Sequence, residues 1–206
     1  MDQLAIYGKS GAIYRGQARK EWTVIPSGYR DASKGVTNTA RLDDWKWRAA
    51  RFASPLPQDD VEWLVMAQHY GLATPLLDWT TSPLIALFFA CEGYEHIGHD
   101  GCVWISDLDQ FDIAYNTLLI SPFGERKKPF AINGVGRNVR STAQDSILTL
   151  HAASDPMNFR HDQIFLVPSG LKIDVMNELS KLGISADRLL YDINHLVSAI
   201  KAGYKY

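Results

Sequence analysis

Residues 68–90 read QHYGLATPLLDWTTSPLIALFFA, and this stretch decides how the rest of the chain is interpreted. Its first part carries a histidine, a tyrosine, an aspartate, a tryptophan and several hydroxyl side chains. From residue 84 it is an apolar run that belongs in a core. Ligand pockets combine mostly apolar walls with a few convergent polar groups. The stretch therefore predicts a ligand pocket beside the core of the domain.

A helix is expected to start inside this stretch. Ser82 followed by Pro83 is typical of a helix start, with a hydroxyl cap and then proline at the first helical position. Thr80, Thr81 and Ser82 would then lie at a helix N-terminus, where free backbone N–H groups and the helix dipole favour an anion. The alternative interpretation is that these hydroxyl groups only cap the helix.

Composition indicates one globular domain over residues 1–206. Hydrophobic residues make up 46% of the chain and charged residues 21%, which is enough apolar material for a core and excludes disorder. The net charge of −2 gives no overall basic field of the kind that marks nucleic-acid binding. A local basic patch remains compatible with that charge.

The sequence also predicts a cytoplasmic protein that is not embedded in a membrane. The two cysteines, Cys91 and Cys102, follow no metal-binding spacing and are expected as free thiols in a reducing compartment. No signal peptide is recognisable at the N-terminus. No apolar run reaches the roughly 20 residues that a membrane-spanning helix needs.

The hydrophobic pattern predicts an α+β architecture, with helices early and late around strands in the middle. A short strand is expected from residue 12, ending in a polar turn at residues 15–17. The further strands are expected at residues 101–106 and 163–168, with an irregular stretch at residues 108–142. The expected helices cover residues 41–52, 59–71, the segment from Ser82, 173–182 and 185–201.

Three charged or titratable residues stand out as candidates for ligand chemistry. Arg15 ends an apolar strand and precedes Gly16, so a ligand or a backbone can approach it closely. Its planar guanidinium suits a phosphate, although an arginine in a salt bridge at a strand edge is the alternative. His69 could bind a ligand or transfer a proton, or could bond a backbone carbonyl. Asp78, beside Trp79, could orient His69 or Arg15.

Two further clusters carry weaker signals. His96 and His99 lie near Glu95 and Asp100, but they lack a third spaced histidine or cysteine, so we expect no metal site. A basic stretch at residues 126–128, together with Arg137 and Arg140, is typical of a solvated loop and could also contact a phosphate backbone.

These motifs resemble the FRG-domain family, which is named for an aromatic-Arg-Gly motif. The motif here is YRGQ at residues 14–17, followed by Trp22, Pro26-Ser27 and Arg30. The central family signature, close to QHYGxxTxLLDWT with a run ending in Phe-Ala, is matched by residues 68–90. A later Arg-x-x-Gln before a strand is matched by Arg160 and Gln163. The resemblance covers nearly the whole chain.

The FRG pattern in turn resembles an ADP-ribosyltransferase core, which implies packed small β-sheets with surrounding helices. By this resemblance the arginine clamps the phosphates of NAD, the hydroxyl groups bind its ribose, and an aromatic side chain stacks on nicotinamide. Such enzymes usually carry a glutamate where this chain has Gln163. Either Asp78 supplies the negative charge, or a nucleophilic substrate does more of the work, or the domain binds NAD-like ligands without turnover. The resemblance implies catalytic roles for Gln163, Asp78 and His69. It implies NAD-binding roles for Arg15, Gly16, Gln17, Tyr70, Thr80, Thr81, Ser82 and Arg160.

The implied activity is transfer of ADP-ribose from NAD, as co-substrate, to a nucleic acid or a protein. The family's frequent occurrence in bacterial and phage conflict systems implies a toxin or defence effector, with an antitoxin or regulator as a partner. Two alternatives stay open. A non-catalytic nucleotide- or RNA-binding module would suit Gln163 better, and an RNA phosphotransferase-like enzyme would need Arg15, His69 and Arg160 on phosphates.

Overall fold

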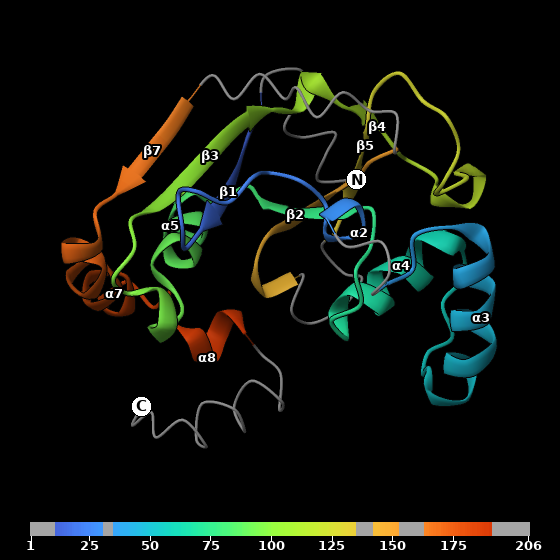
Figure 1. Cartoon of the computed structure of the whole chain (residues 1–206), viewed down its shortest axis with the longest axis horizontal. Coiled ribbons are helices and arrows are strands. Elements are labelled where there is room, and N and C mark those ends of the chain that lie inside the picture. Colours follow the sequence, from blue (N-terminus) through green and yellow to red (C-terminus); the bar gives the residue numbers. More distant parts are fainter. Residues whose placement is uncertain (1–10, 31–34, 135–141, 153–162, 191–206) are drawn as a thin grey trace.

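The computed structural model describes residues 11–30, 35–134, 142–152 and 163–190, and these form one domain around a single sheet (Figure 1). The strands are β1 (Ala12–Gln17), β2 (Leu76–Thr80), β3 (Gly101–Asp107), β4 (Asp112–Ile113), β5 (Phe130–Asn133), β6 (Ser146–Leu150) and β7 (Gln163–Val167). Their order across the sheet is β4-β5-β6-β2-β1-β3-β7. β4 and β5 are parallel, and the other neighbours are antiparallel.

The mixed helix and strand content agrees with the expected class, but the strands do not form packed small sheets. They join one seven-stranded sheet because β2 bridges β1 on one side and β6 on the other. The sequence did not identify β2 or β6 as strands. The polar residues of the central signature, Asp78 and Thr80, interrupt the apolar pattern of β2.

Six α-helices accompany the sheet in the described ranges. They are α2 (Ser27–Arg30), α3 (Thr39–Ala49), α4 (Asp60–His69), α5 (Pro83–Cys91), α7 (Lys172–Lys181) and α8 (Ala186–Leu189). The expected start at Ser82 is confirmed, and the hydroxyl of Ser82 accepts a hydrogen bond from the Ile85 N–H at 3.4 Å. Gly71 and Gly183 follow α4 and α7 with φ angles of +84° and +77°. Glycine adopts this left-handed conformation at little cost, so both predicted helix ends are confirmed.

Two predictions about irregular and helical segments need correction. Residues 108–142 contain β4 and β5, which are too short to show a clear alternating pattern. The final helix was expected to reach residue 201, but α8 ends at Leu189, and residues 191–206 lie outside the described part of the chain.

The helices cover one face of the sheet in two groups (Figure 1). α3 and α4 pack over the β2–β6 region, where Leu64 meets Leu76 and Leu150 in one apolar cluster. α5 and α7 pack over the β1–β3 region in clusters that contain Ala86 and Val103. The junction of β1 and β2 therefore lies between the two groups.

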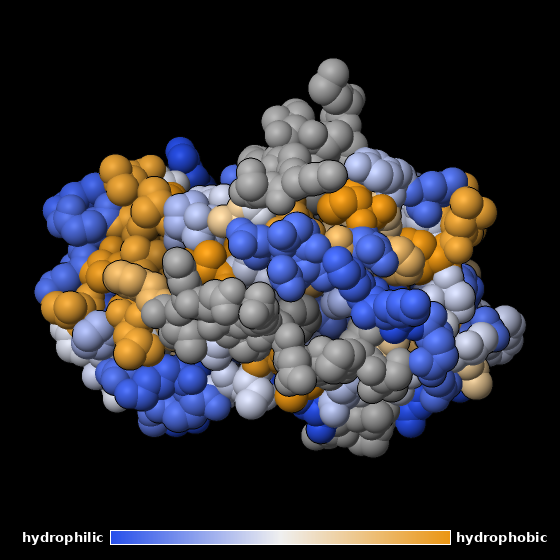
Figure 2. Space-filling model, turned by 90° about the horizontal axis from the view of Figure 1, so that it is seen from above, coloured by the Kyte–Doolittle hydropathy of each residue, from blue (hydrophilic) through white to orange (hydrophobic). Residues whose placement is uncertain are grey.

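The outer edge of the sheet at β7 is apolar. Phe165 and Leu166 are adjacent in this strand and are 59% and 54% exposed. Figure 2 shows apolar side chains gathered at the same end of the molecule, where Leu171 and Ile173 are also exposed. Neighbouring residues in a strand point to opposite faces, so this edge is apolar on both faces. Within the described ranges, no helix is both long and apolar enough to cross a bilayer.

Candidate functional site

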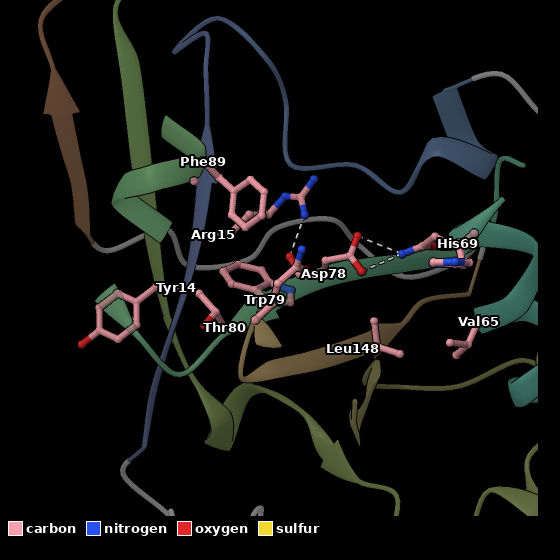
Figure 3. A pocket seen from close by; sticks show the side chains of 12 residues that line it. Tyr14, Arg15, Val65, His69, Asp78, Trp79, Thr80, Phe89 and Leu148 are labelled. Carbon is pink, nitrogen blue, oxygen red and sulfur yellow. Dashed lines mark hydrogen bonds between the residues drawn. The ribbon is translucent and has the colours of Figure 1, made fainter. Parts of the chain in front are cut away.

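The sheet opens between its two central strands. β1 pairs with β3 along its full length, and β2 pairs along its full length with β6. Between β1 and β2, the described residues share one register pair, Tyr14 with Thr80. Beyond that pair the strands diverge, and a pocket of about 250 Å³ lies at the opening (Figure 3). Its lining comes from both strands, from α4 and α5, and from two residues near β6. These residues are Tyr14, Arg15, Gly16, Val65, Gln68, His69, Asp78, Trp79, Thr80, Phe89, Gln144 and Leu148.

Arg15 is a partly buried cation at the point of divergence. Its Nη1 donates a hydrogen bond to the main-chain oxygen of Asp78 at 2.6 Å (Figure 3). Its Nε is buried and has no hydrogen-bond partner among the described residues. Burial lowers the pKa of the Arg15 guanidinium, the Asp78 carboxylate opposes this shift, and the charge of Arg30 adds to it. A desolvated and incompletely bonded cation favours an anionic ligand.

The carboxylate of Asp78 is held in place from α4. The Nε2 of Gln68 donates to both carboxylate oxygens, at 2.8 and 2.9 Å (Figure 3). The Oε1 of Gln68 accepts a hydrogen bond from the hydroxyl of Thr74, which is fully buried. The Thr74 N–H in turn donates to the Ser27 hydroxyl at 3.2 Å. This chain of hydrogen bonds joins three residues of the central signature, Gln68, Thr74 and Asp78.

Aromatic residues form much of the remaining wall. The His69 ring packs edge-on against Tyr70, with 5.1 Å between ring centroids, and Tyr70 is 61% exposed. Trp79 is buried, and its Nε1 donates to the Thr149 hydroxyl at 3.0 Å. That hydroxyl lies 2.8 Å from His151 Nε2. The pocket wall is thus braced from the core behind it.

The imidazole behind Trp79 is neutral over the ordinary pH range. Burial, with smaller contributions from the charges of Arg126 and Arg15, lowers the pKa of His151 to about 3. Protonation of His151 is therefore unavailable near neutral pH, and this imidazole adds no charge behind the site.

The hydroxyl groups near α5 are largely engaged in capping. The Thr80 hydroxyl accepts from the Ser82 N–H at 3.1 Å, and the Ser82 hydroxyl caps the helix. The Thr81 N–H donates to the Asp145 main-chain oxygen at 3.2 Å. Of these three residues, which the resemblance places at the NAD site, Thr80 lines the pocket and Thr81 and Ser82 do not.

The residue types at positions 16 and 17 are explained by packing and hydrogen bonding within the fold. A Cβ at Gly16 would lie 1.9 Å from the main-chain oxygen of Ala86, so glycine permits α5 to pack on β1. The Gln17 side chain is buried, and its Oε1 accepts from Trp104 Nε1 at 2.6 Å. The backbone of Gly16 still lines the pocket.

Besides Gln17, Tyr70, Thr81 and Ser82, Gln163 is also absent from the lining residues of this pocket. Gln163 begins β7 and pairs with Ile105, so β3 separates its strand from β1. Arg160 lies outside the described residues. The structure adds lining residues that were not predicted as site residues, and these are Tyr14, Val65, Gln68, Trp79, Phe89, Gln144 and Leu148. Gln68 could have been found from its place in the signature. Gln144 lies far away in sequence and carries no motif.

The weaker candidate clusters are engaged within the fold. Arg19 Nη2 lies 2.5 Å from His99 Nε2, and Lys20 pairs with Asp100 at 2.9 Å. Within the part of the chain that the structure describes, no three His, Cys, Asp or Glu side chains are grouped so that they could hold a metal ion. Arg126 donates to main-chain oxygens of residues 121, 122, 124 and 150 and lies over the Phe130 ring at 5.2 Å. Arg137 and Arg140 lie outside the described ranges.

Comparison with known proteins identifies one family. No curated protein and no solved structure matches the chain. The family model described as FRG domain matches residues 10–98, which include β1, the central signature and α5. This matched segment supplies the pocket's arginine, its aspartate and the glutamine between them. Residues 10–98 therefore match an FRG domain, and the opening between β1 and β2 lies within the matched segment.

Proposed function

We propose that the pocket binds NAD and that the protein transfers ADP-ribose from it to a nucleic acid or protein acceptor. One observation carries the proposal: a desolvated arginine and a fixed carboxylate, Arg15 and Asp78, line the same opening of the sheet. NAD offers phosphates for the cation, and its reacting ribose develops positive charge that a carboxylate stabilises.

In the proposed reaction, the bond between the ribose C1′ and the nicotinamide nitrogen breaks, and its electron pair leaves with nicotinamide. The ribose becomes oxocarbenium-like, and a nucleophilic atom of the acceptor then bonds to C1′ and loses its proton. Asp78 stabilises the developing positive charge, and Gln68 keeps that carboxylate in position. Phe89 and His69 provide flat walls against the nicotinamide ring.

Gln163 keeps the catalytic role that the resemblance implies only as a prediction. Asp78 is the better candidate for the charged group, because it lines the pocket and its carboxylate is fixed. A role as a toxin or defence effector, with an antitoxin or regulator as partner, also remains part of the proposal and rests on the family resemblance.

The test is nicotinamide release from NAD by the purified protein, with and without cell lysate or RNA. Asp78→Asn preserves the shape of the side chain but removes its charge, and we expect release to fall about 10²-fold. Asp44→Asn is the control, since Asp44 is an exposed acid of α3 paired with Arg48 at 2.8 Å. Gln163→Ala, measured beside them, tests the role implied by the resemblance.

Each outcome separates the alternatives. Equal release by the wild type and Asp78→Asn would exclude the charge-stabilising role. NAD binding by calorimetry without release under any condition would favour the non-catalytic nucleotide- or RNA-binding module. Acceptor-dependent release would establish transfer, and the labelled component of the lysate would identify the acceptor class.

A further inference from the structure

A second hollow adjoins the pocket on the other side of the Arg15–Asp78 contact. Its volume is about 180 Å³, and it shares Arg15, Gln68 and Asp78 with the first pocket. The rest of its lining comes from α2, from the turn after α4 and from β2. These residues are Ser27, Arg30, Gly71, Leu72, Leu76 and Leu77.

Two positive charges face this hollow. Arg30 ends α2, and its charge is close enough to act on the Arg15 guanidinium. Arg15 bonds the main-chain oxygen of Asp78, whereas the carboxylate of Asp78 is engaged by Gln68. The buried Arg15 Nε has no partner among the described residues. Two neighbouring cations with an unused donor form an arrangement that an anion stabilises.

The volumes of the two hollows limit how much of a ligand each hollow can hold. Small-molecule pockets usually measure about 300–1,000 Å³, so a first pocket of about 250 Å³ does not enclose a dinucleotide by itself. The shared wall at Arg15 allows one ligand to extend from the first hollow into the second. A bipartite ligand with a cationic half near Asp78 and an anionic half near Arg15 and Arg30 fits the charges of the two hollows.

We infer that the second hollow is a diphosphate subsite, in which Arg15 and Arg30 bind the two phosphates of the nucleotide from opposite sides. The nicotinamide ribose then occupies the first pocket. This inference rests on the proposed function for the identity of the nucleotide. The binding of a diphosphate is argued from the two arginines alone. It adds Arg30 as a ligand-binding residue and requires a substrate with a diphosphate.

The test is calorimetric titration with inorganic pyrophosphate and, separately, with NAD. In Arg30→Gln we expect pyrophosphate and NAD each to bind about tenfold more weakly or worse, because charge-assisted hydrogen bonds to phosphate are lost. The matched control is Arg48→Gln, which removes an exposed arginine of α3 and should leave both affinities unchanged. Circular dichroism melting of each variant verifies that the fold is intact.

The result that overturns the subsite differs from the result that overturns the proposed function. Absence of pyrophosphate binding, or equal binding by Arg30→Gln and the wild type, rejects the subsite. NAD binding that is unchanged in Arg30→Gln also rejects the subsite but leaves the proposed function standing. Pyrophosphate binding that depends on Arg30, without any binding of NAD, supports the subsite and rejects NAD as the substrate.

Discussion

Arg15 and Lys172 are two desolvated cations that differ in how completely their N–H groups are hydrogen-bonded. Lys172, the first residue of α7, is fully buried, and its Nζ donates to the main-chain oxygens of Ala18 at 2.7 Å and His96 at 3.1 Å. Arg15 donates one described hydrogen bond, to Asp78, and its buried Nε has none. Burial is the largest cause that lowers the pKa of each.

The difference separates a structural cation from a ligand-binding one. The two oxygens that Lys172 bonds belong to the segment matched by the family, and Lys172 lies beyond it, so this lysine joins the later part of the chain to that segment. A guanidinium has five N–H donors, and the fold leaves those of Arg15 incompletely used. Buried donors without partners are rare in folded proteins, which is why an unused donor beside a pocket points to a ligand.

The largest effect should come from removing the structural cation. Lys172→Met keeps most of the side-chain volume but leaves the buried Ala18 carbonyl without its described donor. It also removes one of the two hydrogen bonds to the His96 carbonyl, which still accepts from the His99 N–H at 3.0 Å, so we expect stability to fall by about 1–3 kcal/mol. Urea unfolding measures the change. The control Lys181→Met removes an exposed lysine paired with Glu178, which should alter stability by less than about 0.5 kcal/mol. If Lys172→Met were as stable as the wild type, or more stable, Lys172 would not be a structural cation and the contrast with Arg15 would be wrong.

The second prediction concerns the ligand-binding cation. Arg15→Met should weaken NAD binding about tenfold or more, because a charge-assisted hydrogen bond is worth roughly 1.5–3 kcal/mol. Its stability should change little, since a partly bonded buried charge contributes little to folding. Titration calorimetry and urea unfolding measure the two quantities on the same samples.

Another arginine provides the matched control for this variant. Arg126 donates to several main-chain oxygens, so Arg126→Met should lose stability and, while folded, keep its affinity for NAD. If Arg15→Met instead lost stability and kept NAD affinity, Arg15 would be structural like Lys172, and the proposed site would lack its cation.

The sequence indicated three residues that line the pocket because they lie in contiguous motifs. Arg15, His69 and Asp78 were predicted as candidates, and all three line one pocket. The helices around α4, α5 and α7 were also recognisable, since their caps and glycine ends are local signals. The chain of bonds from Thr74 through Gln68 to Asp78 was not, because it depends on how α4 meets β2.

The single sheet could not be predicted for a related reason. β6 consists of five buried residues with no alternation between exposed and buried positions, so its sequence carries no strand periodicity. Gln144 joins the pocket through the chain fold alone, and it is held by a hydrogen bond to the Leu189 main-chain oxygen at 2.8 Å. Roles that depend on neighbours distant in sequence are set by tertiary structure.

The smallest expected effect concerns Ser82. Its variants distinguish a hydroxyl that caps α5 from one that contacts the ligand. Ser82→Ala removes the cap of α5 and should lower stability by about 1 kcal/mol without changing NAD affinity. Ser82→Asp retains a good capping group and should keep most of that stability. Thermal unfolding and calorimetry of both variants give the answer. If Ser82→Ala keeps its stability but loses NAD affinity, the hydroxyl contacts ribose as the resemblance implies. In that case the ligand site extends along the start of α5, and the incompletely bonded arginine is one of several groups that the fold leaves for the ligand.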